Sequence, residues 1–74
     1  MRVYVQVIDS KTGVYQTGVI DEPVKEGFEV QNAISHFGVN YGHVEWNKSF
    51  INNAQVMFGN IRDTSKIVSV ICNI

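Results

Sequence analysis

The last nine residues, KIVSVICNI from Lys66 to Ile74, constrain the fold of this chain more than any other segment. They form its most apolar run, they are rich in β-branched residues, and they carry no charge after Lys66. An apolar strand left at the edge of a sheet invites aggregation, so such a run is expected to be paired on both sides. The sequence therefore predicts a central β-strand over residues 66–74.

Four other segments have the alternation or the composition of β-strands. With the closing run, the predicted strands are 2–9, 14–20, 39–46, 54–61 and 66–74. The second and third are interrupted by Gly18 and Gly42, which suits the edges of a sheet. Residues 47–53 are expected to form a polar loop in which Phe50 and Ile51 tuck under the end of the sheet.

The hydrophobic period changes once, after Phe28. Apolar residues then recur at the spacing of a single helical stripe, and these are Val30, Ala33, Ile34 and Phe37. Gly38 suits the position just after a helix. Phe28 is off the stripe and is expected to pack where the chain enters the helix. The predicted element order is ββαβββ.

This order predicts a single small α+β domain over residues 1–74, complete in itself. Sequential strands tend to form hairpins, which joins the first two strands and the last three. Pairing 2–9 with 66–74 then gives a five-stranded antiparallel sheet of order 2-1-5-4-3, with the short helix packed on one face. Both interrupted strands fall at the edges.

The two faces of this sheet are predicted to differ. The helix is expected to cover Val3, Val5, Val7, Val44, Trp46, Val56, Phe58, Val68, Val70 and Cys72. The other face would expose a contiguous apolar patch, which monomers rarely do. We expect it to be covered by another protein, either a second copy or a different partner. The alternative is that the sheet curls and the loops at 21–28 and 47–53 fold over this face.

The residues predicted to contact a partner are those expected on that exposed face. They are Tyr4, Ile8, Tyr41, His43, Glu45, Met57, Ile67 and Ile71. Tyr41, His43 and Glu45 alternate along the predicted strand 39–46 and would stand in a row. Residues two apart on a strand are about 6.5–7 Å apart, too far for direct hydrogen bonds. Binding is therefore favoured over proton transfer, and no catalytic residue is predicted.

Composition excludes several classes of function. The net charge is −1 and the six basic residues are scattered, which disfavours nucleic-acid binding. Lys11, Arg62 and Lys66 are expected at one end of the sheet, where they would contact an anion or an acidic partner. The two histidines have no third ligand at suitable spacing, so no metal or cofactor is predicted.

The single cysteine, Cys72, permits no intramolecular disulfide and alternates with Val68 and Val70, which indicates a small buried hydrophobic residue. The apolar run at the start is too short for a signal peptide or a membrane span. With one free thiol, these features predict a cytoplasmic, reducing environment.

The sequence thus favours a non-catalytic protein-binding module, such as a small inhibitor or accessory protein. It would use the exposed sheet face, or an edge strand by β-augmentation, to self-associate or bind a partner. One alternative is a protein that sequesters a small molecule or nucleotide between copies, near Tyr4, Tyr41 and His43. A less favoured one is a nucleic-acid contact at the Lys11, Arg62 and Lys66 end.

Overall fold

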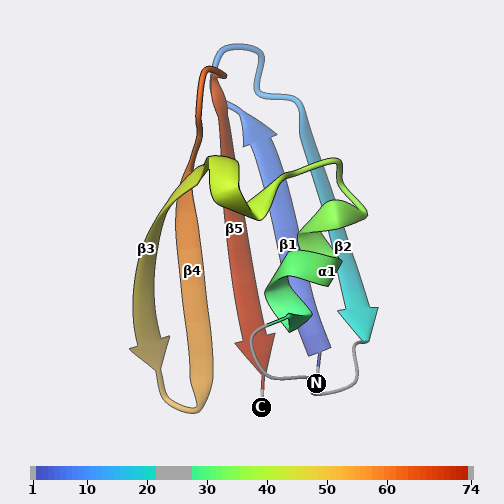
Figure 1. Cartoon of the computed structure of the whole chain (residues 1–74), viewed down its shortest axis with the longest axis vertical. Helices are drawn as coiled ribbons and strands as arrows, with labels where there is room; N and C mark the ends of the chain where they lie inside the picture. The colour runs from blue at the N-terminus through green and yellow to red at the C-terminus, as the bar shows by residue number, and fades with distance from the viewer. Residues whose placement is uncertain (1, 22–27, 74) are drawn as a thin grey trace.

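A computed structural model of the chain describes residues 2–21 and 28–73. Its elements are β1 (Arg2–Asp9), β2 (Tyr15–Asp21), α1 (Glu29–Ser35), the 3-10 turn η1 (Tyr41–His43), β3 (Val44–Ile51), β4 (Ala54–Ile61) and β5 (Lys66–Asn73). The strands form one five-stranded antiparallel sheet of order β2-β1-β5-β4-β3, which confirms the predicted fold class and order (Figure 1). Ile74, the end of the predicted closing strand, lies outside the described residues.

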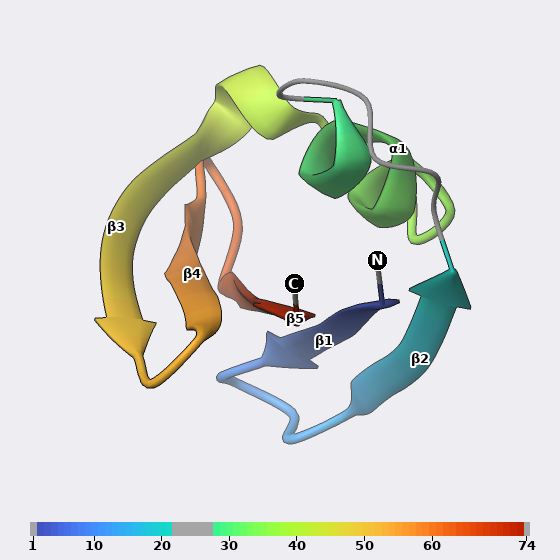
Figure 2. The same cartoon turned by 90° about the horizontal axis from the view of Figure 1, so that it is seen from below.

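The sheet is strongly curled, and α1 lies in its hollow side (Figure 2). We call this side the inner face and the opposite side the open face. The buried hydrophobic core fills the inner face beneath α1. Its members are Val3, Val5, Val7, Ala33, Ile34, Val39, Val44, Met57, Val68, Val70 and Cys72.

The centre of the sheet is built by β1 and β5, whose inner residues stand directly opposite one another. Val5 pairs with Val70 and Val7 with Val68. β-branched side chains fit a pleated surface, and burying each valine contributes about 1.5–3 kcal/mol. The closing run is therefore paired on both sides, as its composition predicts.

The helix is held by packing, because a seven-residue helix is marginal in water alone. Ala33 and Ile34 are fully buried, and Val30 and Phe37 pack against the core, so the predicted stripe is confirmed. The expectation for Phe28 is wrong. It caps the helix without a side-chain hydrogen bond and its side chain is 57% exposed.

The third strand lies further along the chain than predicted. Residues 41–43 form η1, in which the Asn40 side chain accepts a hydrogen bond from the Gly42 backbone, and β3 runs from Val44 to Ile51. The predicted polar loop at 47–53 is therefore mostly strand. A two-residue turn at Asn52 and Asn53 joins it to β4, and Asn52 takes a positive φ of 55°. Asparagine tolerates that conformation better than most residues, so a glycine is not needed there.

In this corrected strand, Phe50 and Ile51 do not tuck under the sheet. Their side chains are 71% and 60% exposed.

The predicted facing of β4 is also wrong. Met57 pairs with Val70 and is 2% exposed, whereas Val56 pairs with Ile71 and Phe58 with Ser69 on the open face. Alternation could not decide this, because apolar residues occupy both faces of β4 and a one-residue slip in register reverses every side chain.

Two glycines on the inner face allow close packing. A Cβ on Gly18 would lie 2.8 Å from the tip of the Phe37 ring, so the missing side chain makes room for that ring. A Cβ on Gly59 would collide with the Glu45 carbonyl group and stand 3.0 Å from a Val44 methyl group. Gly59 therefore allows β3 to approach β4 closely at Val44 and Glu45.

Candidate functional site

The described part of the fold leaves the open face uncovered, since α1 and η1 lie on the inner side (Figure 2). Strand pairing places four residues of each strand on it. They are Tyr15, Thr17, Val19 and Asp21 of β2; Arg2, Tyr4, Gln6 and Ile8 of β1; Ile67, Ser69, Ile71 and Asn73 of β5; Ala54, Val56, Phe58 and Asn60 of β4; and Glu45, Asn47, Ser49 and Ile51 of β3.

An apolar row crosses the middle of this face. Val19, Tyr4, Ile71 and Val56 are consecutive cross-strand neighbours. Directly opposed side chains on one sheet face contact each other, so these four form a continuous stripe over four strands. Five of the eight large hydrophobic residues that are exposed in the described structure belong to the open face: Tyr15, Val19, Ile51, Phe58 and Ile71.

Charge is confined to the corners of the open face. The apolar row and the next row, Thr17, Gln6, Ser69, Phe58 and Asn47, contain no charged residue. Arg2 and Asp21 occupy one corner, where Arg2 Nε lies 3.4 Å from Asp21 Oδ1. Glu45 occupies the diagonal corner. The pair at the first corner is exposed and stabilises the fold little, but it leaves that corner almost neutral.

The surface is uneven along the apolar row. One shallow hollow lies between β2 and β5 and includes Tyr4, Val19 and Ile71. Another lies beside the β3–β4 turn and includes Ala54, Val56 and Ile71. Ile71, 41% exposed, therefore forms a ridge between two depressions.

Five of the eight predicted contact residues lie on the open face. They are Tyr4, Ile8, Glu45, Ile67 and Ile71. Met57 does not, because the register of β4 turns it into the core. Tyr41 and His43 belong to η1, so the predicted row with Glu45 along one strand does not exist. Tyr41 borders a different hollow from Tyr4, so the three residues of the small-ligand alternative do not converge.

Sequence reasoning missed Val56, Phe58, Val19 and Tyr15 as members of this face. The first two were assigned to the opposite side of β4. A signal was present in Gly59, because a glycine at the alternate position marks the side on which another backbone comes close. Val19 and Tyr15 stand opposite Tyr4 and Ile8 in the pairing of β2 with β1, so the predicted hairpin already placed them on the same face.

Tyr41 instead packs on Trp46. Their ring centroids are 5.2 Å apart with planes tilted by 33°, and Trp46 Nε1 donates a hydrogen bond of 3.1 Å to the Tyr41 carbonyl oxygen. Buried indole nitrogens need such a partner. This contact fixes η1 against the start of β3, which is a structural role for Tyr41.

The end of the sheet next to η1 is closed by polar contacts between the β1–β2 and β4–β5 turns. The Ser10 amide and hydroxyl both donate to the Ser65 carbonyl oxygen, at 2.9 and 2.7 Å. The Ser65 hydroxyl in turn donates to Asp9 Oδ1 at 2.7 Å, and the Lys11 amide donates to the same oxygen at 2.9 Å. These hydrogen bonds, the Ser65 one first, lower the pKa of Asp9 below its usual 3.8.

The three predicted anion-contacting residues lie in or beside these turns, as expected. Lys66 borders a hollow between the turns and the segment after α1, whereas Lys11 and Arg62 are not among the residues that line it. The Arg62 amide donates a hydrogen bond of 2.7 Å to the His43 carbonyl oxygen, which connects the β4–β5 turn to η1.

Cys72 is buried and free, as predicted, and desolvation raises the pKa of its thiol, with the Glu29 carboxylate adding to the effect. Within residues 2–21 and 28–73, no three His, Cys, Asp or Glu side chains are grouped so that they would hold a metal ion. Of the helices in those residues, none has both the length and the hydropathy of a membrane span.

Comparisons of the chain with protein-family models, with curated proteins and with solved structures find no match. The open face and the hollow beside Lys66 are therefore interpreted from their own geometry.

Proposed function

We propose that this chain is a non-catalytic protein-binding module whose open face pairs with the open face of a second copy. The observation that carries the proposal is the charge-free, partly aromatic centre of that face. Interface centres are depleted in charge and enriched in Tyr and Phe, whereas a solvated surface is about 25–35% charged.

Three features favour a second copy over an unlike partner. A net charge of −1 leaves little repulsion between copies. The face carries both a ridge at Ile71 and the hollows beside it, and an isologous contact needs knob and hollow on one surface. A two-fold axis perpendicular to the strands and parallel to the sheet would place the strand end that carries Arg2 and Asp21 in one copy over the strand end that carries Glu45 in the other. Like charges would then not face one another.

The face is favoured over an edge strand as the contact surface. Lys48 stands in the middle of the outer strand β3, on the inner side opposite Met57. An inward-pointing charge on an edge strand is a common device against strand addition. β-Augmentation along β3 would have to accommodate that ammonium group.

The size of the face sets the expected affinity. Its outermost positions are roughly 20 Å apart along and across the strands, given standard strand rise and spacing. That is roughly half of the ~800 Å² that each partner buries in a standard-size interface. We therefore propose a weak dimer that forms in the micromolar range. The buried free thiol of Cys72 fits the proposed reducing, cytoplasmic location.

Sedimentation velocity over a range of concentrations tests the proposal. The wild-type chain is expected to change from monomer to dimer as its concentration rises through the micromolar range. Ile71→Lys is expected to remain monomeric, because it places a charge at the centre of the contact. Phe50→Lys is the matched control, since Phe50 is more exposed but lies on the inner side of β3, opposite Gln55.

Circular dichroism establishes that both variants are folded. A wild-type chain that stays monomeric throughout, or an Ile71→Lys variant that dimerises as Phe50→Lys does, would contradict the proposed contact.

A further inference from the structure

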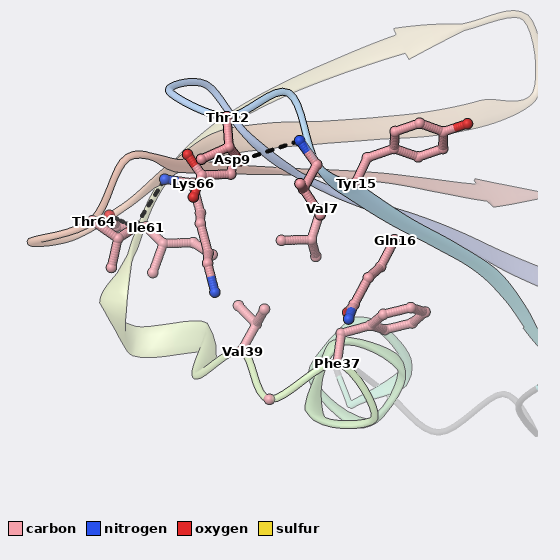
Figure 3. A pocket seen from close by; sticks show the side chains of 12 residues that line it. Val7, Asp9, Thr12, Tyr15, Gln16, Phe37, Val39, Ile61, Thr64 and Lys66 are labelled. Carbon is pink, nitrogen blue, oxygen red and sulfur yellow. Dashed lines mark hydrogen bonds between the residues drawn. The ribbon is translucent and has the colours of Figure 1, made fainter.

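The hollow at the turn end of the sheet is separate from the open face and has the features of a small-ligand site. It has a volume of about 440 Å³, between the β1–β2 hairpin, the β4–β5 turn and the segment that follows α1 (Figure 3). At roughly 30 Å³ per water-sized atom, it holds about fifteen non-hydrogen atoms. Pockets for small molecules begin near ~300 Å³.

Its floor and one side are apolar, and polar side chains complete the lining. Val7 projects from the sheet, Val39 lies opposite it after α1, and the Phe37 ring closes one side (Figure 3). Val7 and Val39 are 8% and 7% exposed, so the floor is part of the well-packed core. A ring or short hydrocarbon chain placed there would be desolvated on several sides.

A single cation reaches into this hollow. The Lys66 side chain extends from the start of β5 toward Val39, with its ammonium group inside the hollow (Figure 3). The ion pair between Arg2 and Asp21 is the only one within residues 2–21 and 28–73, so no described carboxylate lies within 4.0 Å of Lys66 Nζ. The Gln16 side chain also turns inward, toward Phe37 (Figure 3).

The other charged group of the lining, Asp9, is already engaged. Its Oδ1 accepts hydrogen bonds from the Ser65 hydroxyl and the Lys11 amide. Those donors stabilise the carboxylate where it stands and reduce its capacity to select a cationic ligand. Lys66 stands opposite Asp9 across β1 and β5, and its charge contributes to lowering the pKa of Asp9. Because Asp9 Oδ1 already accepts two hydrogen bonds and no described carboxylate is within 4.0 Å of Lys66 Nζ, the ammonium group is the charged group of the lining that can still pair with a ligand.

We propose that this hollow binds a small aromatic carboxylate. The ring lies between Val7, Val39 and Phe37, and the carboxylate pairs with the Lys66 ammonium group. A pocket with an apolar floor and a few placed polar groups suits a ligand that is hydrocarbon at one end and ionic at the other. The site does not depend on the open face and stands whether or not the chain dimerises.

Titration of ¹⁵N-labelled protein with three probes that share a nine-carbon skeleton tests the site. 3-Phenylpropanoate is expected to bind more tightly than 3-phenylpropan-1-ol, and 3-phenylpropan-1-amine least tightly. Saturable shifts are expected at the amides of Gln16, Gly38, Val39 and Lys66. The advantage of the carboxylate over the alcohol is expected to shrink as salt is added, because the ion pair is near solvent.

Lys66→Met keeps the apolar stem and removes the charge. This variant is expected to bind 3-phenylpropanoate about fivefold more weakly and to bind the alcohol with unchanged affinity. Lys66→Arg is expected to bind the carboxylate as tightly as the wild-type chain does. Lys11→Met, in the neighbouring turn but outside the lining, is the matched control and is expected to change neither. If Lys66→Met fails to fold, the ranking of the three probes on the wild-type chain still decides. The proposal would be overturned if the amine bound most tightly or if those amides showed no saturable shift. It would also be overturned if Lys66→Met and Lys11→Met lost equal affinity for 3-phenylpropanoate.

Discussion

Gly59→Ala is expected to destabilise the fold severely. Gly59 pairs with Trp46 across β3 and β4 and is buried on the inner face. An added Cβ would collide with the Glu45 carbonyl group, whose carbon would be 2.8 Å away, and would stand 3.0 Å from a Val44 methyl group. The first obstacle is backbone, so it cannot be relieved by rotating a side chain.

The magnitude follows from two opposing effects. Forcing an extra methyl group into a packed interior costs about 1–3 kcal/mol, and a backbone obstacle places this site at the upper end. Reduced entropy of the unfolded chain offsets about 0.4–1 kcal/mol of that. The net loss of about 2–3 kcal/mol is roughly half of the ~3–5 kcal/mol that a core of this size supplies.

Urea denaturation followed by the emission of Trp46, the single tryptophan, measures this loss. With a slope of about 1 kcal/mol per molar for a small domain, the midpoint is expected to fall by about 2–3 M. The measurement is made at low micromolar protein, where the proposed dimer is dissociated.

Two other glycines provide graded controls. At Gly42 the nearest atom to an added Cβ is Asn40 Oδ1 at 3.5 Å, an ordinary contact, so Gly42→Ala is expected to be nearly neutral. At Gly18 the obstacle is the tip of the Phe37 ring, which can shift, so Gly18→Ala is expected to be intermediate. If Gly59→Ala is as stable as Gly42→Ala, the register of β3 on β4 is wrong.

Three further outcomes are expected. Met57→Ala should lower the free energy of unfolding by about 2–5 kcal/mol in urea denaturation, because Met57 is buried. Phe58→Ala should destabilise the monomer far less, because Phe58 is 45% exposed. If Phe58→Ala is the more destabilising of the two, Phe58 and not Met57 faces the core. The pKa of Asp9 is lowered in the folded state, so its stabilising contribution is complete above 3.8 and is lost as the pH falls through the lowered value. Ser65→Ala removes the largest cause, so a ¹³C carboxyl titration should give a higher pKa for Asp9 in the variant; equal values would refute the role of that hydrogen bond. The Cys72 thiol should react with a disulfide reagent far more slowly in the native protein than in urea, and rapid native labelling would contradict its burial.

The sequence predicted the sheet order because its local signals agreed with one another. The two most apolar strands had to be central, and the two interrupted by glycine suited the edges. The curl of the sheet was considered only within the alternative in which loops cover the exposed face, and the position of β3 was not predicted. The start of β3 depends on η1, which is held by the Asn40 side chain and by the contact between Tyr41 and Trp46. These interactions leave no periodic hydrophobic pattern in the sequence.

The sequence predicted that one face of the sheet would be uncovered and partly apolar, but it did not predict several of the residues on that face. Tyr4, Ile8, Ile67 and Ile71 follow from alternation on strands whose buried residues are all valine or cysteine. On β4, both faces are apolar, so only the register set by the turn distinguishes Met57 from Phe58. The hollow beside Lys66 could not be predicted, because it forms between segments far apart in the chain.

The contact between open faces is tested most directly by isotope-filtered NMR on a mixture of ¹³C-labelled and unlabelled chains at several hundred micromolar. We expect intermolecular NOEs between the Ile71 methyl groups of one copy and the Phe58 or Tyr4 ring of the other, with a diffusion coefficient that approaches that of a dimer. Phe50, on the inner face, should give none. An absence of intermolecular NOEs at Ile71, together with the diffusion coefficient of a monomer, would contradict the account.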